Sequence, residues 1–66
     1  MKLTINGESR EFSEKLTLKA LLSNLGFGEK PVVVELNQEA LAPSEFEKRE
    51  LSDGDQLEII TIAAGG

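Results

Sequence analysis

The sequence predicts an α+β fold, namely a mixed sheet of four to five strands with one main helix packed on one face and a short one-turn helix. Two observations indicate this fold class. Segments near both ends of the chain alternate apolar and polar residues, as half-buried strands do, and one central segment has apolar residues at helical spacing. The expected order is strand, strand, helix, strand, short strand and final strand.

The chain begins with a predicted strand hairpin. Residues 1–5 alternate apolar and polar side chains, and Asn6-Gly7 suits a two-residue type I′ turn, in which both residues need positive φ. A second strand is expected over residues 8–13, with Arg10 opposite Leu3. We interpret it as an edge strand, on which Arg10 lays its aliphatic stem against the core and keeps its charge in water.

The main helix is expected within residues 16–26. Its apolar stripe has the spacing i, i+3, i+4 and i+7 and consists of Leu18, Leu21, Leu22 and Leu25. Thr17 is placed to cap the start, and Gly26 is placed where a left-handed residue commonly ends a helix. Because connections are short and right-handed, this helix should cover one face of the sheet, and the other face must meet solvent or a partner.

Two strands and a one-turn helix are expected next. Residues 32–36 predict a strand, and a shorter strand is expected around Ala40-Leu41. Residues 43–47 predict one helical turn, because Ser44 and Glu47 have the spacing of a capping box.

The last strand is expected over residues 56–62, after a turn at Asp53-Gly54-Asp55. Alternate residues of this strand point inward, yet Ile60 and Ile62 on the other face are apolar too. With Val33 they predict an exposed apolar patch that binds partners. The alternative is a bulge that turns one isoleucine into the core.

The composition excludes most catalytic chemistry. The 66 residues include no Cys and no His, which removes thiolate nucleophiles, imidazole bases and most zinc sites. Asp53 and Asp55 flank a turn glycine and lack the further oxygen ligands of a calcium loop. We therefore expect no metal site, no cofactor and no catalytic residue of the chain's own.

Charge and hydropathy limit the partners. Seven basic residues against 12 acidic ones give a net charge of −5, which disfavours nucleic acid and favours a basic protein partner. No apolar run approaches the roughly 20 residues of a membrane span, and no charged-then-apolar leader opens the sequence. We expect a cytoplasmic protein that binds neither nucleic acid nor a membrane.

The sequence ends in Gly65-Gly66, which we interpret as the end of a flexible tail, residues 63–66, on a domain of residues 1–62. Glycine makes up about 7 % of average sequences, so two terminal glycines arise by chance in roughly 0.5 % of chains. A carboxylate preceded by Gly65 and the small Ala64 can thread a narrow channel in another protein. The alternatives are an expression scar or a frayed terminus.

Together these features resemble a known family. Asn6-Gly7 in the first turn, Asp53-Gly54-Asp55 before the last strand, Val33–Asn37 in the middle strand and the Gly65-Gly66 end resemble the ubiquitin-like β-grasp sulfur carriers, and within them the ThiS family. The resemblance spans the whole chain. The small subunit of molybdopterin synthase is the nearest rival, but it tends to be longer and to carry Pro-Pro before its glycines, where this chain has residues 61–64.

The resemblance implies a carrier that is a substrate and not an enzyme. A ThiF-like or MoeB-like adenylyltransferase would adenylate the Gly66 carboxylate with ATP, because a carboxylate is a poor electrophile and an acyl-AMP has a good leaving group. A sulfur donor protein would then convert it to a thiocarboxylate. The sulfur would pass to a ThiG-like thiazole synthase in thiamine biosynthesis, with Gly65 as the slender neighbour of the reactive terminus.

Three other interpretations stay open at this point. The sulfur could serve molybdopterin or another sulfur-containing metabolite. The chain could be a protein modifier conjugated to lysines, which predicts conjugates of high mass. It could also be a plain interaction domain with incidental glycines, which predicts an unmodified mass in every preparation.

Overall fold

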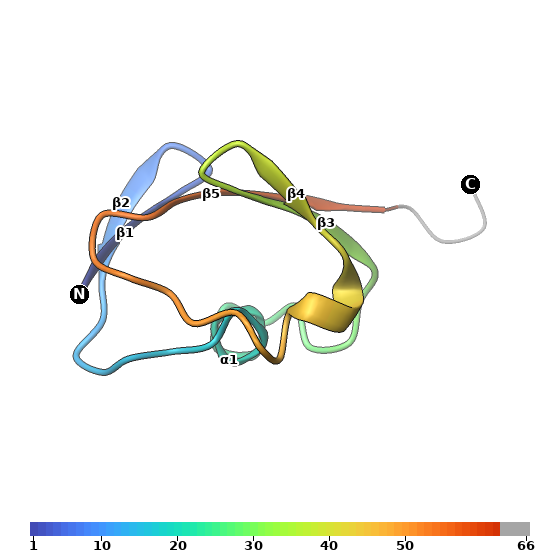
Figure 1. Cartoon of the computed structure of the whole chain (residues 1–66), viewed down its shortest axis with the longest axis horizontal. Coiled ribbons are helices and arrows are strands. Elements are labelled where there is room, and N and C mark those ends of the chain that lie inside the picture. Colours follow the sequence, from blue (N-terminus) through green and yellow to red (C-terminus); the bar gives the residue numbers. More distant parts are fainter. Residues whose placement is uncertain (63–66) are drawn as a thin grey trace.

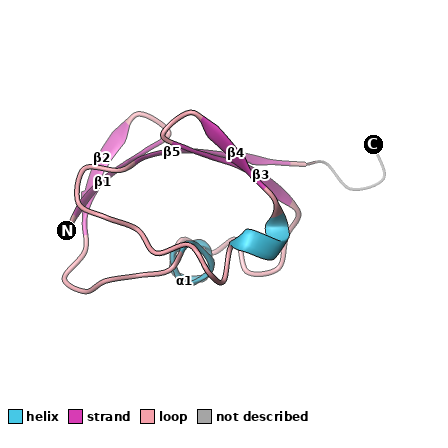
Figure 2. Ribbon diagram, in the orientation of Figure 1, coloured by secondary structure: helices cyan, strands magenta, loops and turns pink. Residues whose placement is uncertain are grey.

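Five strands form one mixed sheet in the computed structural model, which describes residues 1–62 (Figure 2). They are β1 (Lys2–Ile5), β2 (Glu8–Glu11), β3 (Val32–Leu36), β4 (Glu39–Leu41) and β5 (Gln56–Thr61). Their order across the sheet is β2-β1-β5-β3-β4. β1 and β5 run parallel, and the other neighbours are antiparallel. The predicted α+β class, with a mixed sheet and one main helix, is confirmed.

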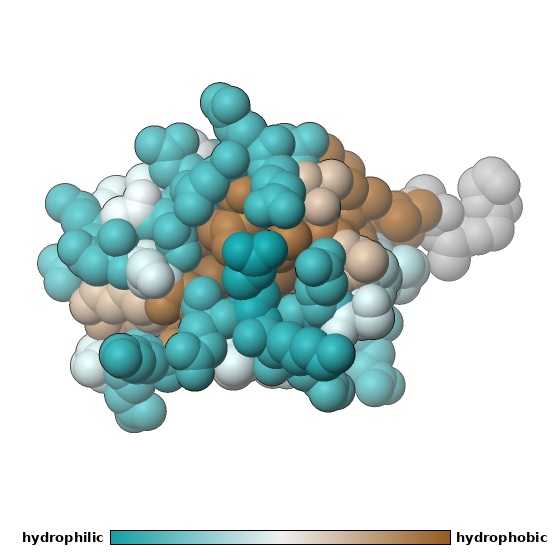
Figure 3. Space-filling model, viewed as in Figure 1, coloured by the Kyte–Doolittle hydropathy of each residue, from teal (hydrophilic) through white to brown (hydrophobic). Residues whose placement is uncertain are grey.

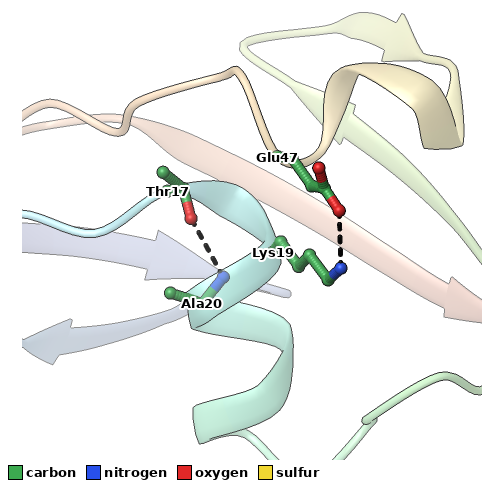
Figure 4. Close-up of polar contacts among 4 residues, drawn as sticks. All are labelled: Thr17, Lys19, Ala20 and Glu47. Carbon is green, nitrogen blue, oxygen red and sulfur yellow. Dashed lines mark hydrogen bonds and ion pairs between the residues drawn. The ribbon is translucent and has the colours of Figure 1, made fainter.

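The main helix, α1 (Leu18–Asn24), begins where the sequence predicts. The Thr17 side chain accepts a hydrogen bond from the Ala20 N–H at 3.1 Å, which satisfies one of the free donors of the first turn (Figure 4). Gly26 follows the helix at a φ of 92°, a left-handed conformation that costs glycine little. Thr17 therefore caps the start of the helix, and Gly26 follows its end, as the sequence predicts.

The core lies between α1 and one face of the sheet (Figure 1). Inward positions alternate along the strands, and in β3 they are Val32, Val34 and Leu36. The fully enclosed side chains are Leu3, Leu18, Leu21, Val34 and Leu57. The other face of the sheet has no helix over it among the described residues (Figure 1).

The first hairpin has the predicted register. Leu3 lies opposite Arg10, and β2 is an edge strand whose four residues are all exposed. Asn6 and Gly7 have φ values of 50° and 83°, as the predicted turn requires. The strand ends at Glu11, two residues before the predicted end.

The capping box predicted from Ser44 and Glu47 is wrong. The 3₁₀ turn η1 (Pro43–Glu45) begins earlier, so Glu45 is the residue whose carboxylate accepts from the Ala42 N–H, at 3.0 Å. Alanine has no side-chain acceptor, so only this half of the motif forms. Glu47 lies beyond the turn and contacts Lys19 of α1 instead, with 2.7 Å between carboxylate Oε1 and Nζ.

The Lys19–Glu47 contact ties α1 to the segment that follows η1 (Figure 4). The hydrogen bond from Lys19, and then its charge, lower the pKa of Glu47 below its ordinary value. The hydrogen bond and charge of Glu47 likewise raise the pKa of Lys19. Both side chains are exposed, so the contribution to stability is small and screened by salt.

This pair predicts a pH-dependent effect of Glu47→Gln. A carboxyl whose pKa is lowered by folding stabilises the fold above its unfolded pKa of about 4.3, and this stabilisation disappears as the pH falls through the lowered value. The free energy of unfolding should therefore be higher for the parent chain at pH 7 and equal for both chains in strong acid. Denaturant unfolding at the two pH values checks this, and a difference that does not change with pH would contradict it.

Candidate functional site

The face of the sheet that α1 leaves uncovered carries three exposed apolar side chains. Val33, Ile60 and Ile62 are 43 %, 61 % and 51 % exposed, and they are the only large apolar residues so exposed within residues 1–62. Val33 of β3 lies directly opposite Ile60 of β5. We call these three residues the apolar patch. Figure 3 shows apolar surface, in brown, that reaches the end of the described chain.

The alternative of a bulge in the last strand is wrong. β3 and β5 pair without interruption from Val32 opposite Thr61 to Leu36 opposite Leu57. The side chains of β5 therefore keep strict alternation, and Ile60 faces away from the core. The exposure of the apolar patch is a property of this fold, whereas its role in binding stays a prediction.

Two carboxylates lie beside the apolar patch on the same open face. Glu35 of β3 and Glu58 of β5 are directly opposite each other and both exposed. Within the described part of the chain, neither side chain takes part in an ion pair or a side-chain hydrogen bond. This pair could not be predicted from the sequence, because the two carboxylates are brought together by the register of two strands that are distant in sequence.

Asn6 has a second role that sequence analysis missed. Its side chain accepts a hydrogen bond from the Ile59 N–H at 2.7 Å and donates one to the Ile59 carbonyl at 3.1 Å. These bonds hold the middle of β5 to the end of β1, beyond the last paired residues of the two strands. Asn6 thereby fixes the strand from which Ile60 projects.

The aspartates of the last turn are structural, as the sequence indicates. Asp53 accepts a hydrogen bond from the Lys2 N–H at 2.6 Å. Asp55 accepts one from the Ser52 N–H at 2.7 Å and one from the Asn37 side chain at 3.0 Å. Over residues 1–62 no group of three or more acidic side chains is arranged to hold a metal ion.

A small cavity separates α1 from the segment around η1. It has a volume of about 400 Å³, and its walls include Leu22, Val32 and Phe46, with the Lys19–Glu47 pair at its edge. Within residues 1–62, no helix is both long enough and apolar enough to cross a membrane.

The predicted reactive and threading residues, Gly66, Gly65 and Ala64, lie outside the described residues. What the structure describes is the point from which they continue. β5 leads to Ile62, whose N–H donates to the Pro31 carbonyl at 3.1 Å. This end of the chain lies at one extremity of the molecule, remote from the N-terminus (Figure 1). Four extended residues span about 13–14 Å from such a point.

Known proteins resemble this chain in both sequence and fold. Residues 3–66 match the ThiS family. The chain is 42 % identical to the sulfur carrier protein ThiS of Thermus thermophilus, over 94 % of this chain and 95 % of that protein. The sequence is also 36 % identical to that of the thiamine biosynthesis protein ThiS from Geobacter metallireducens. The crystal structure of that protein matches the present fold with a TM-score of 0.84 and complete coverage of both chains.

A second kind of relative is larger. The chain is 46 % identical, over its full length, to a thiazole synthase of Paramagnetospirillum magneticum, and it spans 20 % of that protein. A thiazole synthase of Magnetococcus marinus shows the same coverage at 33 % identity. Because the match to the family covers almost the entire sequence and the full-length relatives agree with it, the chain belongs to the ThiS family.

Proposed function

We propose that this chain is a sulfur carrier of thiamine biosynthesis that holds sulfur as a thiocarboxylate on Gly66. Because the chain belongs to the ThiS family, it is a sulfur carrier and not a catalyst. The match to the family extends through residue 66, so the glycines belong to the matched region. This makes an expression scar an inadequate explanation of them.

The proposed chemistry takes place at one carboxylate. Its oxygen attacks the α-phosphorus of ATP, pyrophosphate leaves, and an acyl-adenylate forms. A donor protein then supplies sulfur at the oxidation level of sulfide. This sulfur attacks the carbonyl carbon, the bond from that carbon to the AMP oxygen breaks, AMP leaves, and a thiocarboxylate results. We assign the acid–base and phosphate-binding groups for these steps to the partners, which is consistent with a chain that has no His and no Cys.

We assign the chain two enzyme partners and place it in the cytoplasm with them. A ThiF-like or MoeB-like adenylyltransferase activates Gly66. A ThiG-like thiazole synthase accepts the sulfur, and the two larger relatives support this assignment because their names are those of thiazole synthases. Gly65 has no side chain and Ala64 has only a methyl group, so we expect the terminus to be slender enough to enter both enzymes.

Intact-mass spectrometry tests the proposal. The purified chain is incubated with ATP, a sulfur donor and the adenylyltransferase encoded in the same genome. We expect the chain to gain the mass of one exchange of oxygen for sulfur, located at Gly66 by fragmentation. An unchanged mass would contradict the proposal, and conjugation to lysines would favour a protein modifier.

The apolar patch is the proposed docking surface for the adenylyltransferase. Ile60→Glu should weaken binding to this enzyme by about tenfold or more, because it places a charge in a contact that must lose its water. The fold should be unaffected, since Ile60 is exposed. Calorimetric titration measures the binding, and the unfolding midpoint reports the stability.

Ser9→Glu is the matched control for this variant. Ser9 lies opposite Thr4 on the far edge strand, so the variant adds the same charge at a distance from the patch. It should bind like the parent chain. Equal binding by Ile60→Glu and the parent chain, with both folded, would exclude the apolar patch from the interface.

A further inference from the structure

We propose that Asn6 is a site of slow, spontaneous deamidation, that the fold slows this reaction, and that the reaction loosens β5 from β1 once it has occurred. The proposal concerns the ageing of the chain and does not depend on the chemistry proposed for Gly66. It rests on two observations. Asn6 is followed by Gly7, and both polar atoms of its carboxamide are hydrogen-bonded to the backbone of β5.

Deamidation of an asparagine is a reaction with the backbone of the next residue. The backbone nitrogen of Gly7, after losing its proton to hydroxide, attacks the side-chain carbonyl carbon of Asn6. A carbon–nitrogen bond forms to Gly7, the bond from the same carbon to the side-chain nitrogen breaks, and ammonia leaves with a proton from water. A second water then opens the cyclic imide at either carbonyl, which gives aspartate or isoaspartate. The net reaction consumes one water and releases one ammonia.

The sequence makes Asn6 the most reactive of the three asparagines. The side chain of the following residue crowds the attacking nitrogen, and glycine has no side chain. Asn24 and Asn37 are instead followed by leucine and glutamine. Asn6 and Gly7 are also both exposed, so water and hydroxide reach the turn.

The folded chain opposes the attack because the Asn6 carboxamide is held by β5. Its oxygen accepts from the Ile59 N–H at 2.7 Å, and its nitrogen donates to the Ile59 carbonyl at 3.1 Å. Closure of the imide ring requires the carboxamide to turn back onto the Gly7 nitrogen, so these bonds must break first. Two hydrogen bonds of ordinary strength should slow the reaction by about tenfold or more.

The aspartate product cannot restore both bonds. Its carboxylate still accepts from the Ile59 N–H, but it has no hydrogen to donate to the Ile59 carbonyl. A carboxylate oxygen then faces a partly buried carbonyl oxygen that has lost its donor, which destabilises the contact between β1 and β5.

The isoaspartate product disturbs the turn itself. Its main chain passes through the side-chain carbon, which adds one atom to the backbone. The turn between Ile5 and Glu8 contains only Asn6 and Gly7, and this length sets the register of β1 with β2. The longer backbone cannot keep both the turn and the register. Either product therefore leaves a chain that opens more readily than before.

Peptide mapping of an aged sample tests the site. The purified chain is incubated at mildly alkaline pH, in buffer and in guanidinium chloride, and samples are digested with trypsin. Cleavage after Lys2 and Arg10 releases residues 3–10, and the asparagine, aspartate and isoaspartate forms of this peptide separate by chromatography. We expect conversion at Asn6 in guanidinium chloride and conversion about tenfold slower, or slower still, in buffer. The other two asparagines should convert far more slowly in guanidinium chloride.

Two measurements separate the chemistry from the protection. Gly7→Ala, compared with the parent chain in guanidinium chloride where no fold remains, should convert severalfold more slowly. In guanidinium chloride below the unfolding transition, the conversion of the parent chain and the hydrogen exchange of the Ile59 N–H should accelerate together. The same opening exposes both groups.

Asn6→Asp reproduces one product and tests its effect on the fold. Aspartate, like asparagine, tolerates the φ of 50° at this position, so the variant changes the hydrogen bond and not the backbone. Its unfolding midpoint should lie about 4–8 °C below that of the parent chain. Ser9→Asp adds the same charge on the exposed edge strand β2, and it should shift the midpoint by less than half as much.

The proposal is overturned if Asn6 does not convert in guanidinium chloride, or if it converts equally fast in buffer. Conversion that does not follow the exchange of the Ile59 N–H would exclude β5 as the source of protection. An Asn6→Asp chain as stable as the parent chain, or no less stable than Ser9→Asp, would overturn the proposed effect on the fold. These measurements use no partner enzyme, so none of the outcomes bears on the proposed sulfur chemistry.

Discussion

Deletion of Gly66 should leave a folded chain that is no longer thiolated. The deletion moves the terminal carboxylate by about 3.5 Å along an extended tail, whereas productive catalytic geometry tolerates about 0.5 Å. A misplacement of even 1 Å can cost about 10²-fold in rate, so we expect a loss of at least that size. The fold should be unchanged, because the core residues with the highest numbers, Leu57 and Ile59, lie well before the deletion.

The measurement is the rate of mass gain with the adenylyltransferase, ATP and a sulfur donor. A variant with one additional glycine after Gly66 is the matched control, because it moves the carboxylate the same distance in the other direction and should also fail. Thiolation of the deletion variant at the rate of the parent chain would exclude Gly66 as the reactive residue.

Gly65→Val should lose activation nearly as completely while the carboxylate stays at its normal distance. A β-branched side chain is wide and stiff at χ1, so it cannot follow glycine through a channel that fits only backbone. We expect a loss of about 10²-fold or more in the rate of thiolation. The unfolding midpoint should not change, since the core residues of the described chain end, in sequence, at Ile59.

A graded series distinguishes a narrow channel from a general intolerance of change. Gly65→Ala adds a single methyl group and should fall between the parent chain and Gly65→Val. Equal rates for all three chains would contradict the threading of the terminus. Loss of rate together with a lower unfolding midpoint would attribute the effect to the fold.

Much of this fold could be predicted from short sequence motifs, because each motif acts on residues next to it in the chain. Thr17 caps α1 within its own first turn, and Gly26 ends it. Asn6-Gly7 forms the predicted turn, which sets the register of β1 and β2 and therefore the position of Arg10 opposite Leu3. The exposure of Ile60 could be predicted because side chains alternate along the last strand and the sequence contains only one main helix, which covers one face of the sheet.

Features that depend on contacts distant in sequence could not be predicted in the same way. Ser44 and Glu47 have capping spacing, but the start of η1 and the contact with Lys19 place Glu47 elsewhere. The hydrogen bonds of Asn6 to Ile59 arise only when β1 and β5 lie side by side. The opposition of Glu35 and Glu58 likewise appears only in the paired sheet.

A single-turnover transfer experiment tests whether Gly66 carries sulfur to thiazole formation. The chain is thiolated with ³⁵S, freed of ATP and donor, and mixed with thiazole synthase and its other substrates. We predict that the label leaves the chain and enters the thiazole product, one sulfur for each chain, while the chain returns to its original mass. Label that stays on the chain, or that appears in lysine conjugates, would contradict the account.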